Sequence, residues 1–311
     1  MCKNNICKTV LKFLVMMVLV FFLIQKINWL EVLEYLKNMK IVFIFLFIFF
    51  YLGGILISAK KWQVLAEFKK FKQSYFFYFK TYLLGTFLNN FFPSFVGGDA
   101  YRIHALGKYN KRFKDSSVSV VVDRISGLMG VVILAAIFGI LNYQNIAKTS
   151  LISWLVISMG IISILFFLGV FFFDTNVIQK SLDYLPKKIK LYIKQLGEFK
   201  FSKIFSKTMS YSFLFVLVGI ALANYMLFLA LGIQLSLFDF LSVTFLANII
   251  ASIPISMGNI GIKEWAYILL FSTFGVSISA AVTIVVIARV LQMLISLLAL
   301  PFYLKNKESL K

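Results

Sequence analysis

Charged residues are scarce in this chain, and together with the high hydrophobic content this scarcity excludes a water-soluble fold. Only 14% of the 311 residues are charged and 61% are hydrophobic, whereas soluble domains carry roughly 25% charged and about 45–50% apolar residues. A soluble protein could not bury such a surplus of apolar side chains. Lipid must therefore be the solvent for much of the surface, and the chain divides into membrane spans of about 20 residues each.

Acidic residues are the rarer charged class, because 12 Asp and Glu stand against 32 Lys and Arg, which gives a net charge of +20. In a soluble protein this balance would point to nucleic acid, but no basic stretch carries a nucleic-acid motif. In a membrane protein, Lys and Arg gather in cytoplasmic loops beside anionic lipid headgroups. We therefore expect membrane lipids with anionic headgroups as partners, and no nucleic acid.

Cysteine and histidine are nearly absent. Cys2 and Cys7 lie in the basic N-terminal arm, and His104 is the single histidine, so a disulfide framework and a zinc site are excluded. We expect no metal and no cofactor. The sequence also has no glycine-rich phosphate loop, no zincin helix and no Gly-x-Ser-x-Gly elbow. These absences predict that the protein is not an enzyme.

Six apolar runs are long enough to cross a bilayer; they lie at residues 10–27, 41–58, 118–141, 151–173, 210–232 and 277–303. The first follows a basic arm but has no small-residue cleavage site after it, so we interpret it as an uncleaved helix. Two further runs, 75–92 and 239–253, end at Pro and Gly within hydrophobic sequence. Such breaks free backbone groups that hydrocarbon cannot satisfy, so they belong where protein or a watery cavity supplies partners.

Positive charge predicts the arrangement of these segments. The positive-inside rule places the basic stretches on the cytoplasmic side; they are 1–12, 59–72, 102–114, 180–207 and the tail after Tyr303. All of them fit only if 75–105 is a re-entrant hairpin from the cytoplasm and 239–275 one from the outside. The expected fold is an all-α polytopic membrane protein with about six full spans and two opposed re-entrant helical hairpins. It forms a single transmembrane domain, 1–311, in the cytoplasmic membrane, with both termini and the basic loop 174–208 in the cytoplasm.

The two hairpins resemble each other and predict an inverted repeat, with halves at about 75–141 and 239–303. TFLNN at 86–90 matches TFLAN at 244–248. Each is followed by a proline, a glycine-rich turn and a span with one arginine; the arginine lies 31 residues after the proline in the first copy and 35 in the second. Inverted repeats with broken helices that meet near the midplane are an architecture of transporters.

Arg289, near the centre of the last span, is the leading candidate for a functional side chain. An ionised group at that depth costs about 2.5–3.5 kcal/mol on insertion scales, so it needs a partner or a wet cavity. Glu264 is the natural acid partner in the same repeat, and Asp99 and Asp123 are alternatives across the interface. Either a structural ion pair ties the helices together or Arg289 faces an anionic headgroup. Arg124 could snorkel to the cytoplasmic headgroups.

Polar and small residues mark the inner ends of the hairpins. Asn89, Asn90 and Asn248 could cap the broken helices or bind polar atoms of a ligand. The residues that permit the hairpin turns are Pro93, Gly97, Gly98, Pro254, Gly258 and Gly261. A half-helix that begins after Gly261 would aim its positive N-terminal end at the midplane, where a phosphate is favoured.

These stretches are similar to one membrane family. LNNFFPSFVGGDAYRIHAL (88–106), followed by SVVVDRISGLMGV (119–131), resembles the N-P-G-D-x-x-R and (D/E)-R pattern of the lysylphosphatidylglycerol synthase transmembrane, or flippase-like, family. SIPISMGNIGIKEWAYILL (252–270) resembles its P-x-S-x-G-G-x-G-x-x-E motif, and VVIARVLQMLISL (285–297) its final Arg-bearing helix. The resemblance covers about residues 10–303. It departs at Met257 and Asn259, which replace the Pro and Gly usual in the second turn.

Carried over position by position, the resemblance singles out Asn90, Pro93, Gly98, Asp99, Arg102, Arg124, Pro254, Gly258, Gly261, Glu264 and Arg289. Together with the repeat it predicts a substrate-binding set made of Asn90, Asp99, Arg102, Asp123, Arg124, Glu264 and Arg289. The arginines would neutralise a phosphate. In bifunctional members a cytosolic aminoacyl-transfer domain follows the membrane region. This chain stops at Lys311, so we expect a stand-alone member without lysyl transfer activity.

The predicted function is that of a flippase or transporter, which moves an anionic phospholipid or a polyprenyl-linked lipid across the cytoplasmic membrane. Two alternatives stay open. The chain could be a non-transporting partner of an enzyme of cell-envelope lipid or glycan synthesis, or an intramembrane enzyme acting on lipid phosphates. Its protein partners would be further copies of itself or such an envelope-biosynthesis enzyme.

Overall fold

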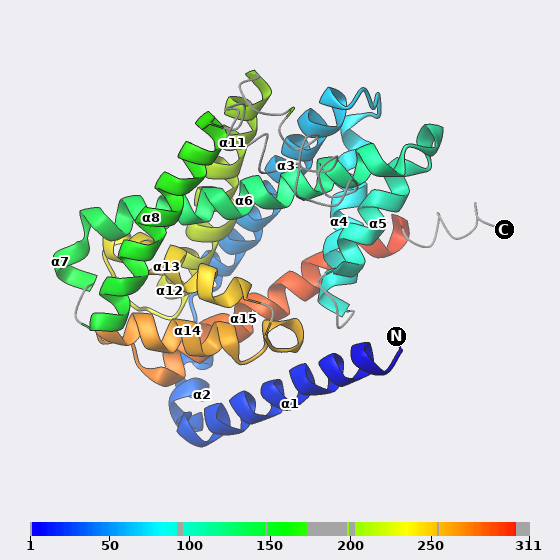
Figure 1. The fold of residues 1–311 in the computed structure, drawn as a ribbon. Helices are drawn as coiled ribbons and strands as arrows, with labels where there is room; N and C mark the ends of the chain where they lie inside the picture. Colours follow the sequence, from blue (N-terminus) through cyan, green and yellow to red (C-terminus); the bar gives the residue numbers. More distant parts are fainter. Residues whose placement is uncertain are drawn as a thin grey trace.

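The structure is a computed structural model, and it describes residues 2–91, 96–146, 149–172, 198, 203–253 and 255–302. These residues are helical with short connections, and no strand occurs among them. In the first half of the chain (Figure 1) the helices are α1 (Cys2–Lys26), α2 (Trp29–Lys37), α3 (Ile41–Phe68), α4 (Tyr75–Phe91), α5 (Val96–Gly107), α6 (Phe113–Leu141), α7 (Tyr143–Ile146) and α8 (Ser150–Phe172). In the second half they are α11 (Lys203–Phe215), α12 (Ala223–Ala230), α13 (Leu237–Ser252), α14 (Ile262–Phe271) and α15 (Ile278–Ser296).

The all-α membrane fold predicted from the sequence is confirmed. Four helices are long and apolar enough to cross a bilayer; they run over Ile41–Phe68, Phe113–Leu141, Ile204–Ala230 and Ile278–Phe302. Val10–Lys26 and Trp29–Lys37 pass the same criterion as a pair, although they meet at a bend of 81°. Ser150–Phe166 and Leu237–Ser252 are shorter apolar helices. Six full spans, their orientation and the cytoplasmic basic loops stay predictions, and most of the loop 174–208 lies outside the described residues.

Two broken segments lie where the sequence predicts hairpins. In the first, α4 ends at Phe91 and α5 begins at Val96; in the second, α13 ends at Ser252 and α14 begins at Ile262. Each pair is followed by a long helix, α6 or α15, so the order of helix, break, short helix and long helix occurs twice. Pro93 and Pro254 lie outside the described residues. The opposed orientation of the two copies remains a prediction.

Close helix packing holds the centre of the molecule together. The span Ile204–Ala230 consists of α11 and α12 joined by a π-helical turn, Val216–Leu222, and it packs against α3. A Cβ built on Gly54 of α3 would lie 2.5 Å from the Cα of Gly219 in that turn. The two backbones therefore touch, as small residues allow in membrane proteins. π-Helical turns are often found at functional sites.

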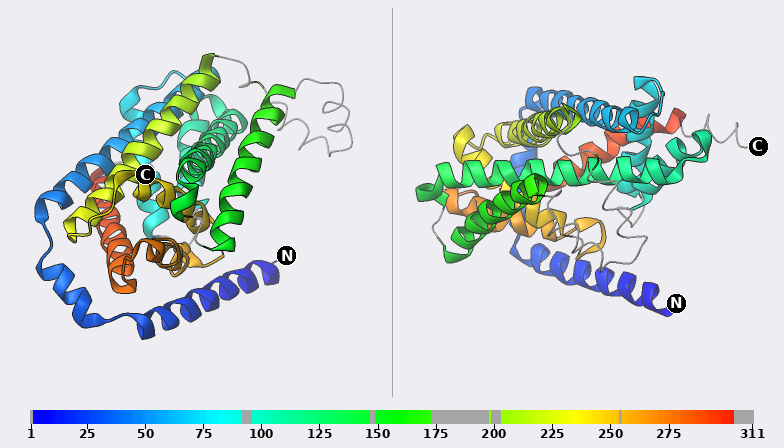
Figure 2. Two further views of the ribbon diagram at one scale, coloured as in Figure 1. Left: turned by 90° about the vertical axis from the view of Figure 1, so that its left-hand side faces the viewer. Right: turned by 45° about the horizontal axis from the view of Figure 1, so that its top comes forward.

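Helix α1 lies along the edge of the bundle (Figure 2). Much of its surface is exposed and apolar, including Phe13, Leu14 and Phe21, as expected for a helix that faces lipid. At its C-terminal end it is fixed to the second half of the chain: the Trp265 indole N–H donates to the Leu19 carbonyl (3.3 Å), and the Asn28 N–H donates to Ser279 Oγ (3.1 Å).

Candidate functional site

The first-half cluster consists of Lys61, Asp99, Arg102, Asp123 and Arg124, from α3, α5 and α6. Asp123 accepts from Arg102 Nη2 at 2.7 Å and pairs with Lys61 Nζ at 3.1 Å. The side chains of these three residues are only 2–3% exposed. Two cations thus enclose one buried carboxylate, and the arrangement ties α3, α5 and α6 together.

Aromatic rings complete the enclosure of Arg102. Its guanidinium carbon lies 4.4 Å from the ring centroid of Trp62 and 4.3 Å from that of Tyr82. Cation–π contacts of this kind are strongest where water is excluded. The sequence analysis placed Arg102 in a basic cytoplasmic loop, 102–114, and expected it to neutralise a phosphate. In the structure Arg102 lies within α5 rather than in a loop, and its contacts are the chain's own carboxylates and rings. Its place relative to the membrane and its role toward a phosphate stay predictions.

The outer part of the same cluster is an ion pair between α5 and α6. Arg124 Nε donates to Asp99 Oδ2 at 2.8 Å and Nη2 donates to Oδ1 at 3.1 Å, so the pair is bidentate. Asp99 also contacts Arg102 Nη1 at 3.4 Å. The Arg124 side chain is 51% exposed, which makes it the accessible member of the cluster.

The second-half cluster consists of Lys263, Glu264 and Arg289, from α14 and α15. Arg289 Nη2 donates to Glu264 Oε1 at 3.1 Å, and Nη1 donates to the Gly258 carbonyl at 3.0 Å. Glu264 is the acid that the sequence assigned to Arg289, and neither Asp99 nor Asp123 pairs with it. Because a guanidinium carries five N–H donors, Arg289 keeps donors beyond these two bonds.

Glu264 also caps the start of α14. Gly261, at φ +86°, is the N-cap residue of this helix, and its N–H donates to Glu264 Oε2 at 2.7 Å. The sequence analysis expected a phosphate to be favoured at this N-terminus. In the structure the chain's own carboxylate is placed there instead, where the helix dipole stabilises negative charge. Any anion near this helix would therefore have to be held by the cationic side chains nearby rather than by the helix N-terminus.

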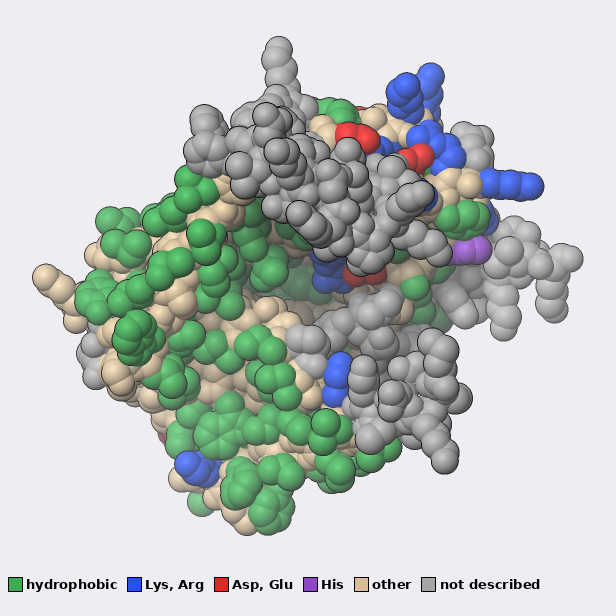
Figure 3. Space-filling view, in the orientation of Figure 1, with side chains coloured by type: hydrophobic (Ala, Val, Ile, Leu, Met, Phe, Trp, Pro, Cys, Tyr) green, Lys and Arg blue, Asp and Glu red, His purple; other side chains and the backbone are tan. Residues whose placement is uncertain are grey.

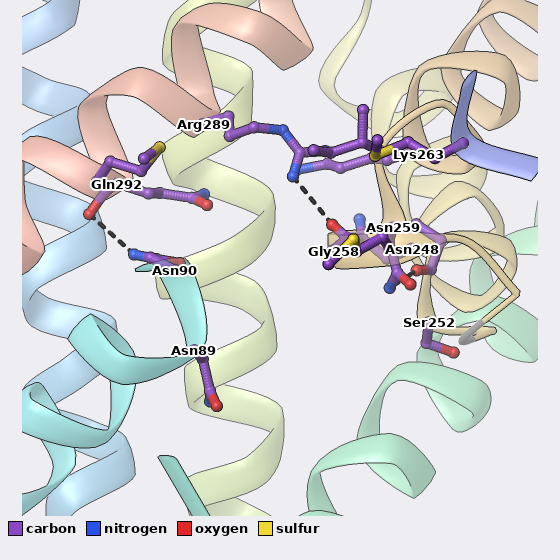
Figure 4. A pocket seen from close by; sticks show the side chains of 14 residues that line it. Asn89, Asn90, Asn248, Ser252, Gly258, Asn259, Lys263, Arg289 and Gln292 are labelled. Atoms are coloured by element: carbon purple, nitrogen blue, oxygen red, sulfur yellow. Dashed lines mark hydrogen bonds between the residues drawn. The ribbon is translucent and has the colours of Figure 1, made fainter. Parts of the chain in front are cut away.

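A cavity of about 660 Å³ lies where the two hairpins meet (Figure 4); we call it the central cavity. Asn89 and Asn90 at the end of α4 face Asn248 and Ser252 at the end of α13, and the turn 257–260 forms a further wall. Lys263 and Arg289 lie side by side on one side of it (Figure 4). Its volume is within the range of about 300–1,000 Å³ found for ligand sites.

The cavity carries an excess of positive charge. Among the described residues Lys263 forms no ion pair; its ammonium lies 5.7 Å from the ring centroid of Tyr267. Arg289 and Lys263 are therefore balanced by Glu264 alone, which leaves one net positive charge. Figure 3 shows, on one face of the molecule, a few basic and acidic side chains at a recess beside a broad hydrophobic surface. An anionic group is the ligand that this cavity suits best.

The asparagines at the hairpin ends serve the backbone first. Asn89 Oδ1 accepts from the Gly98 N–H at 2.9 Å, which links α4 to α5. Asn90 Nδ2 donates to the Gln292 carbonyl at 3.3 Å, which links the first hairpin to α15, and Asn248 Nδ2 donates to the Thr244 carbonyl at 2.8 Å. Among the described residues these bonds engage one atom of each amide, and all three residues line the central cavity.

The two turns use glycine for different reasons. A Cβ on Gly98 would collide with the Gly85 carbonyl and lie 2.7 Å from Asn89 Oδ1, so α5 packs on α4 without room for a side chain. A Cβ on Gly97 would meet nothing within 4 Å, so packing does not require a glycine there. Gly258 and Gly261 both have positive φ, as a tight turn in the second hairpin requires.

The structure thus divides the predicted set into two groups. Arg289 and Asn90 line the central cavity, and Glu264 lies beside it; Asp99, Arg102, Asp123 and Arg124 form a separate cluster that does not line it. Sequence reasoning missed two cations. Lys61 was assigned to a cytoplasmic stretch although α3 continues to Phe68, and Lys263 was passed over although it adjoins Glu264. For Lys263, the available signal was its position next to an acidic residue in a broken apolar helix.

Comparisons with known proteins agree on one family. The sequence model described as the lysylphosphatidylglycerol synthase TM region matches residues 9–299. A UPF0104 membrane protein of Pyrococcus horikoshii is 28% identical over 306 residues, which cover 89% of this chain and 91% of that protein. A UPF0104 membrane protein of Methanothermobacter thermautotrophicus is 28% identical over 234 residues, 67% of this chain and 69% of that protein.

Proposed function

Since the chain belongs to the lysylphosphatidylglycerol synthase TM-region family, we propose that this integral membrane protein is a translocator for lipids with an anionic, phosphate-bearing headgroup. The observation that supports the proposal most directly is the central cavity. It lies between two broken helices and holds Arg289 and Lys263 against one carboxylate. Polar groups within membrane helices usually mark substrate paths. The headgroup would be bound and moved without a chemical change.

The headgroup would meet a ready set of donors. Arg289 offers the N–H groups that Glu264 and Gly258 leave unused, Lys263 adds a second cation, and the amides of Asn89 and Asn248 border the same space. Hydrogen bonds to charged groups contribute about 1.5–3 kcal/mol each. The lipid tails would stay in the bilayer while the headgroup passes through the polar cavity. The basic stretches place both termini in the cytoplasm in this proposal.

The test is translocation of a fluorescent phosphatidylglycerol in proteoliposomes, followed by bleaching of the outer leaflet. We expect the wild-type protein to exceed protein-free vesicles and to prefer phosphatidylglycerol over the zwitterionic phosphatidylcholine. Arg289→Ala should lower the rate roughly ten- to hundredfold, the equivalent of about 1.5–3 kcal/mol. Lys263→Met should lower it less, because Arg289 remains.

Arg112 supplies the matched control. Its side chain is 32% exposed and pairs with Asp115, much as Arg289, at 30%, pairs with Glu264. Arg112 does not line the central cavity, so Arg112→Ala should translocate at the wild-type rate. No translocation by the well-folded wild-type protein, or a wild-type rate in folded Arg289→Ala, would overturn the proposal.

A further inference from the structure

A second cavity, of about 320 Å³, lies next to the central one and is lined almost entirely by apolar side chains; we call it the apolar groove. Its walls are α1 and α2 on one side and α14 and α15 on the other. Leu23, Val282 and Thr283 at its base are buried, whereas Ile24 and Val286 at its rim are about half exposed. The groove is thus closed at its base and open at its rim.

The polar atoms at its base are satisfied. Glu264 borders the groove, but one carboxylate oxygen accepts from Arg289 and the other from the Gly261 N–H. Thr283 Oγ1 donates to the Ser279 carbonyl at 2.6 Å. The groove therefore presents mainly hydrocarbon to whatever fills it, and the oxygens at its base are already engaged.

The groove and the central cavity adjoin each other and share part of their lining. Ile260 lines both, and the neighbours Lys263 and Glu264 border one cavity each. Along α15 the groove is lined by residues up to Ile287 and the central cavity by residues from Arg289 onward. On α1 the corresponding residues are Val20 and Met16. At 1.5 Å per residue, Arg289 lies only about 9 Å along α15 from Thr283.

The wall that α1 and α2 form is fixed in place. The Trp265 indole N–H donates to the Leu19 carbonyl of α1, and Ser279 Oγ accepts from the Asn28 N–H in the connection between α1 and α2. Ser277 Oγ donates to Glu31 Oε1 of α2 at 2.5 Å. A Cβ on Gly261 would lie 2.6 Å from Leu19 Cβ, so the hairpin turn packs directly on α1. The groove is therefore a built feature of the fold.

We propose that the apolar groove holds one hydrocarbon chain of the lipid whose phosphate is bound by Arg289 and Lys263. This rests on the proposed function and deepens it, because it defines the ligand as a single lipid that occupies both cavities. Lipid tails are as apolar as the groove itself, so burial from water supplies no driving force. What the groove contributes is van der Waals packing, which selects chains by shape and orients the headgroup toward Arg289.

The experiment uses phosphatidic acid with a photoreactive diazirine in its acyl chain. This lipid is present in trace amounts in phosphatidylcholine vesicles that contain the full-length protein. After illumination, labelled peptides are mapped by mass spectrometry. We expect labelling concentrated on α1 around Val20–Ile27 and on α15 around Val282–Ile287. Val286→Trp, which fills the rim, should reduce this labelling several-fold. Val290→Trp is the matched control, since Val290 is 49% exposed beside 47% for Val286 but lines neither cavity.

Arg289→Ala decides whether head and tail belong to one molecule. If they do, loss of the phosphate contact should also reduce labelling in the groove several-fold. Uniform labelling of lipid-facing helices such as α3 and α8, which marks annular lipid only, would overturn the inference. So would groove labelling that is insensitive to Arg289→Ala. The labelling result can be read independently of translocation. Groove labelling that depends on Arg289, without translocation, would overturn the proposed function but not this inference. Translocation without groove labelling would overturn this inference but not the proposed function.

Discussion

Arg124 pairs with Asp99 in the first half of the chain, and Arg289 pairs with Glu264 in the second. Both acids lie in the first turn of the second hairpin helix, and both arginines follow 25 residues later in the chain. The two pairs thus occupy equivalent places in the repeated order of helix, break, short helix and long helix. The difference lies in what surrounds them.

Each cluster has one positive charge more than it has carboxylates. In the first-half cluster the excess positive charge is buried. Arg102 and Lys61 both pair with Asp123, and the rings of Trp62 and Tyr82 cover the Arg102 guanidinium. In the second-half cluster Lys263 and Arg289 line a cavity. The comparison teaches that equivalent charge patterns serve different purposes: enclosed, they fix helices to one another; beside a cavity, they are available to a ligand.

Removal of the enclosed carboxylate should have the largest effect on stability. In Asp123→Asn, Lys61 would stay buried without a carboxylate partner, and Arg102 would keep only its longer contact with Asp99. Breaking a buried pair in this way costs about 3–5 kcal/mol. Thermal unfolding in detergent measures the loss. Asp115→Asn, which breaks the partly exposed pair with Arg112, is the control and should cost at most about 1 kcal/mol. Equal losses in the two variants would show that the first-half cluster is not a structural clasp.

The close approach of α4 and α5 gives a smaller effect with a sharper control. Gly98→Ala forces a methyl group against the Gly85 carbonyl and Asn89, and overpacking of this kind costs about 1–3 kcal/mol. Gly97→Ala, one residue earlier, meets open space and should be neutral or slightly stabilising, because alanine is the better helix former. Unfolding temperatures of the two variants test this. Similar values would mean that the first hairpin is looser than the structure describes.

Sequence patterns predicted the helices and their breaks because apolar length and Pro-Gly interruptions act locally. The pairing of Glu264 with Arg289 was also predictable, since a buried cation needs an acid and the repeat 239–303 holds only Glu264 besides Asp239 at its very start. The contact of Lys61 with Asp123 was not predictable from the sequence. In the sequence Lys61 belongs to a basic stretch that follows an apolar run, and only the length of α3 and its packing on α6 bring it to Asp123.

The capping of α14 shows a second limit. The sequence places a glycine turn, an acid and a helix start in order, which fits an open anion site as well as a capped one. Which of the two is realised depends on the rotamer of Glu264, and that is set by its contact with Arg289 on another helix. The sequence indicates that Glu264 and Arg289 pair, but it does not indicate that the second carboxylate oxygen then accepts from the Gly261 N–H.

The last prediction concerns Arg124, where the two halves are compared directly. Arg124→Ala removes an ion pair whose arginine is half exposed, so stability should fall by no more than about 1 kcal/mol. Because Arg124 does not line the central cavity, its loss should reduce translocation of fluorescent phosphatidylglycerol far less than Arg289→Ala does. If both variants translocate equally slowly while unfolding at the wild-type temperature, the first-half pair also contacts the headgroup. The two ion pairs would then bind the headgroup one after the other during translocation. The difference in their burial would then belong to one conformation of the transport cycle.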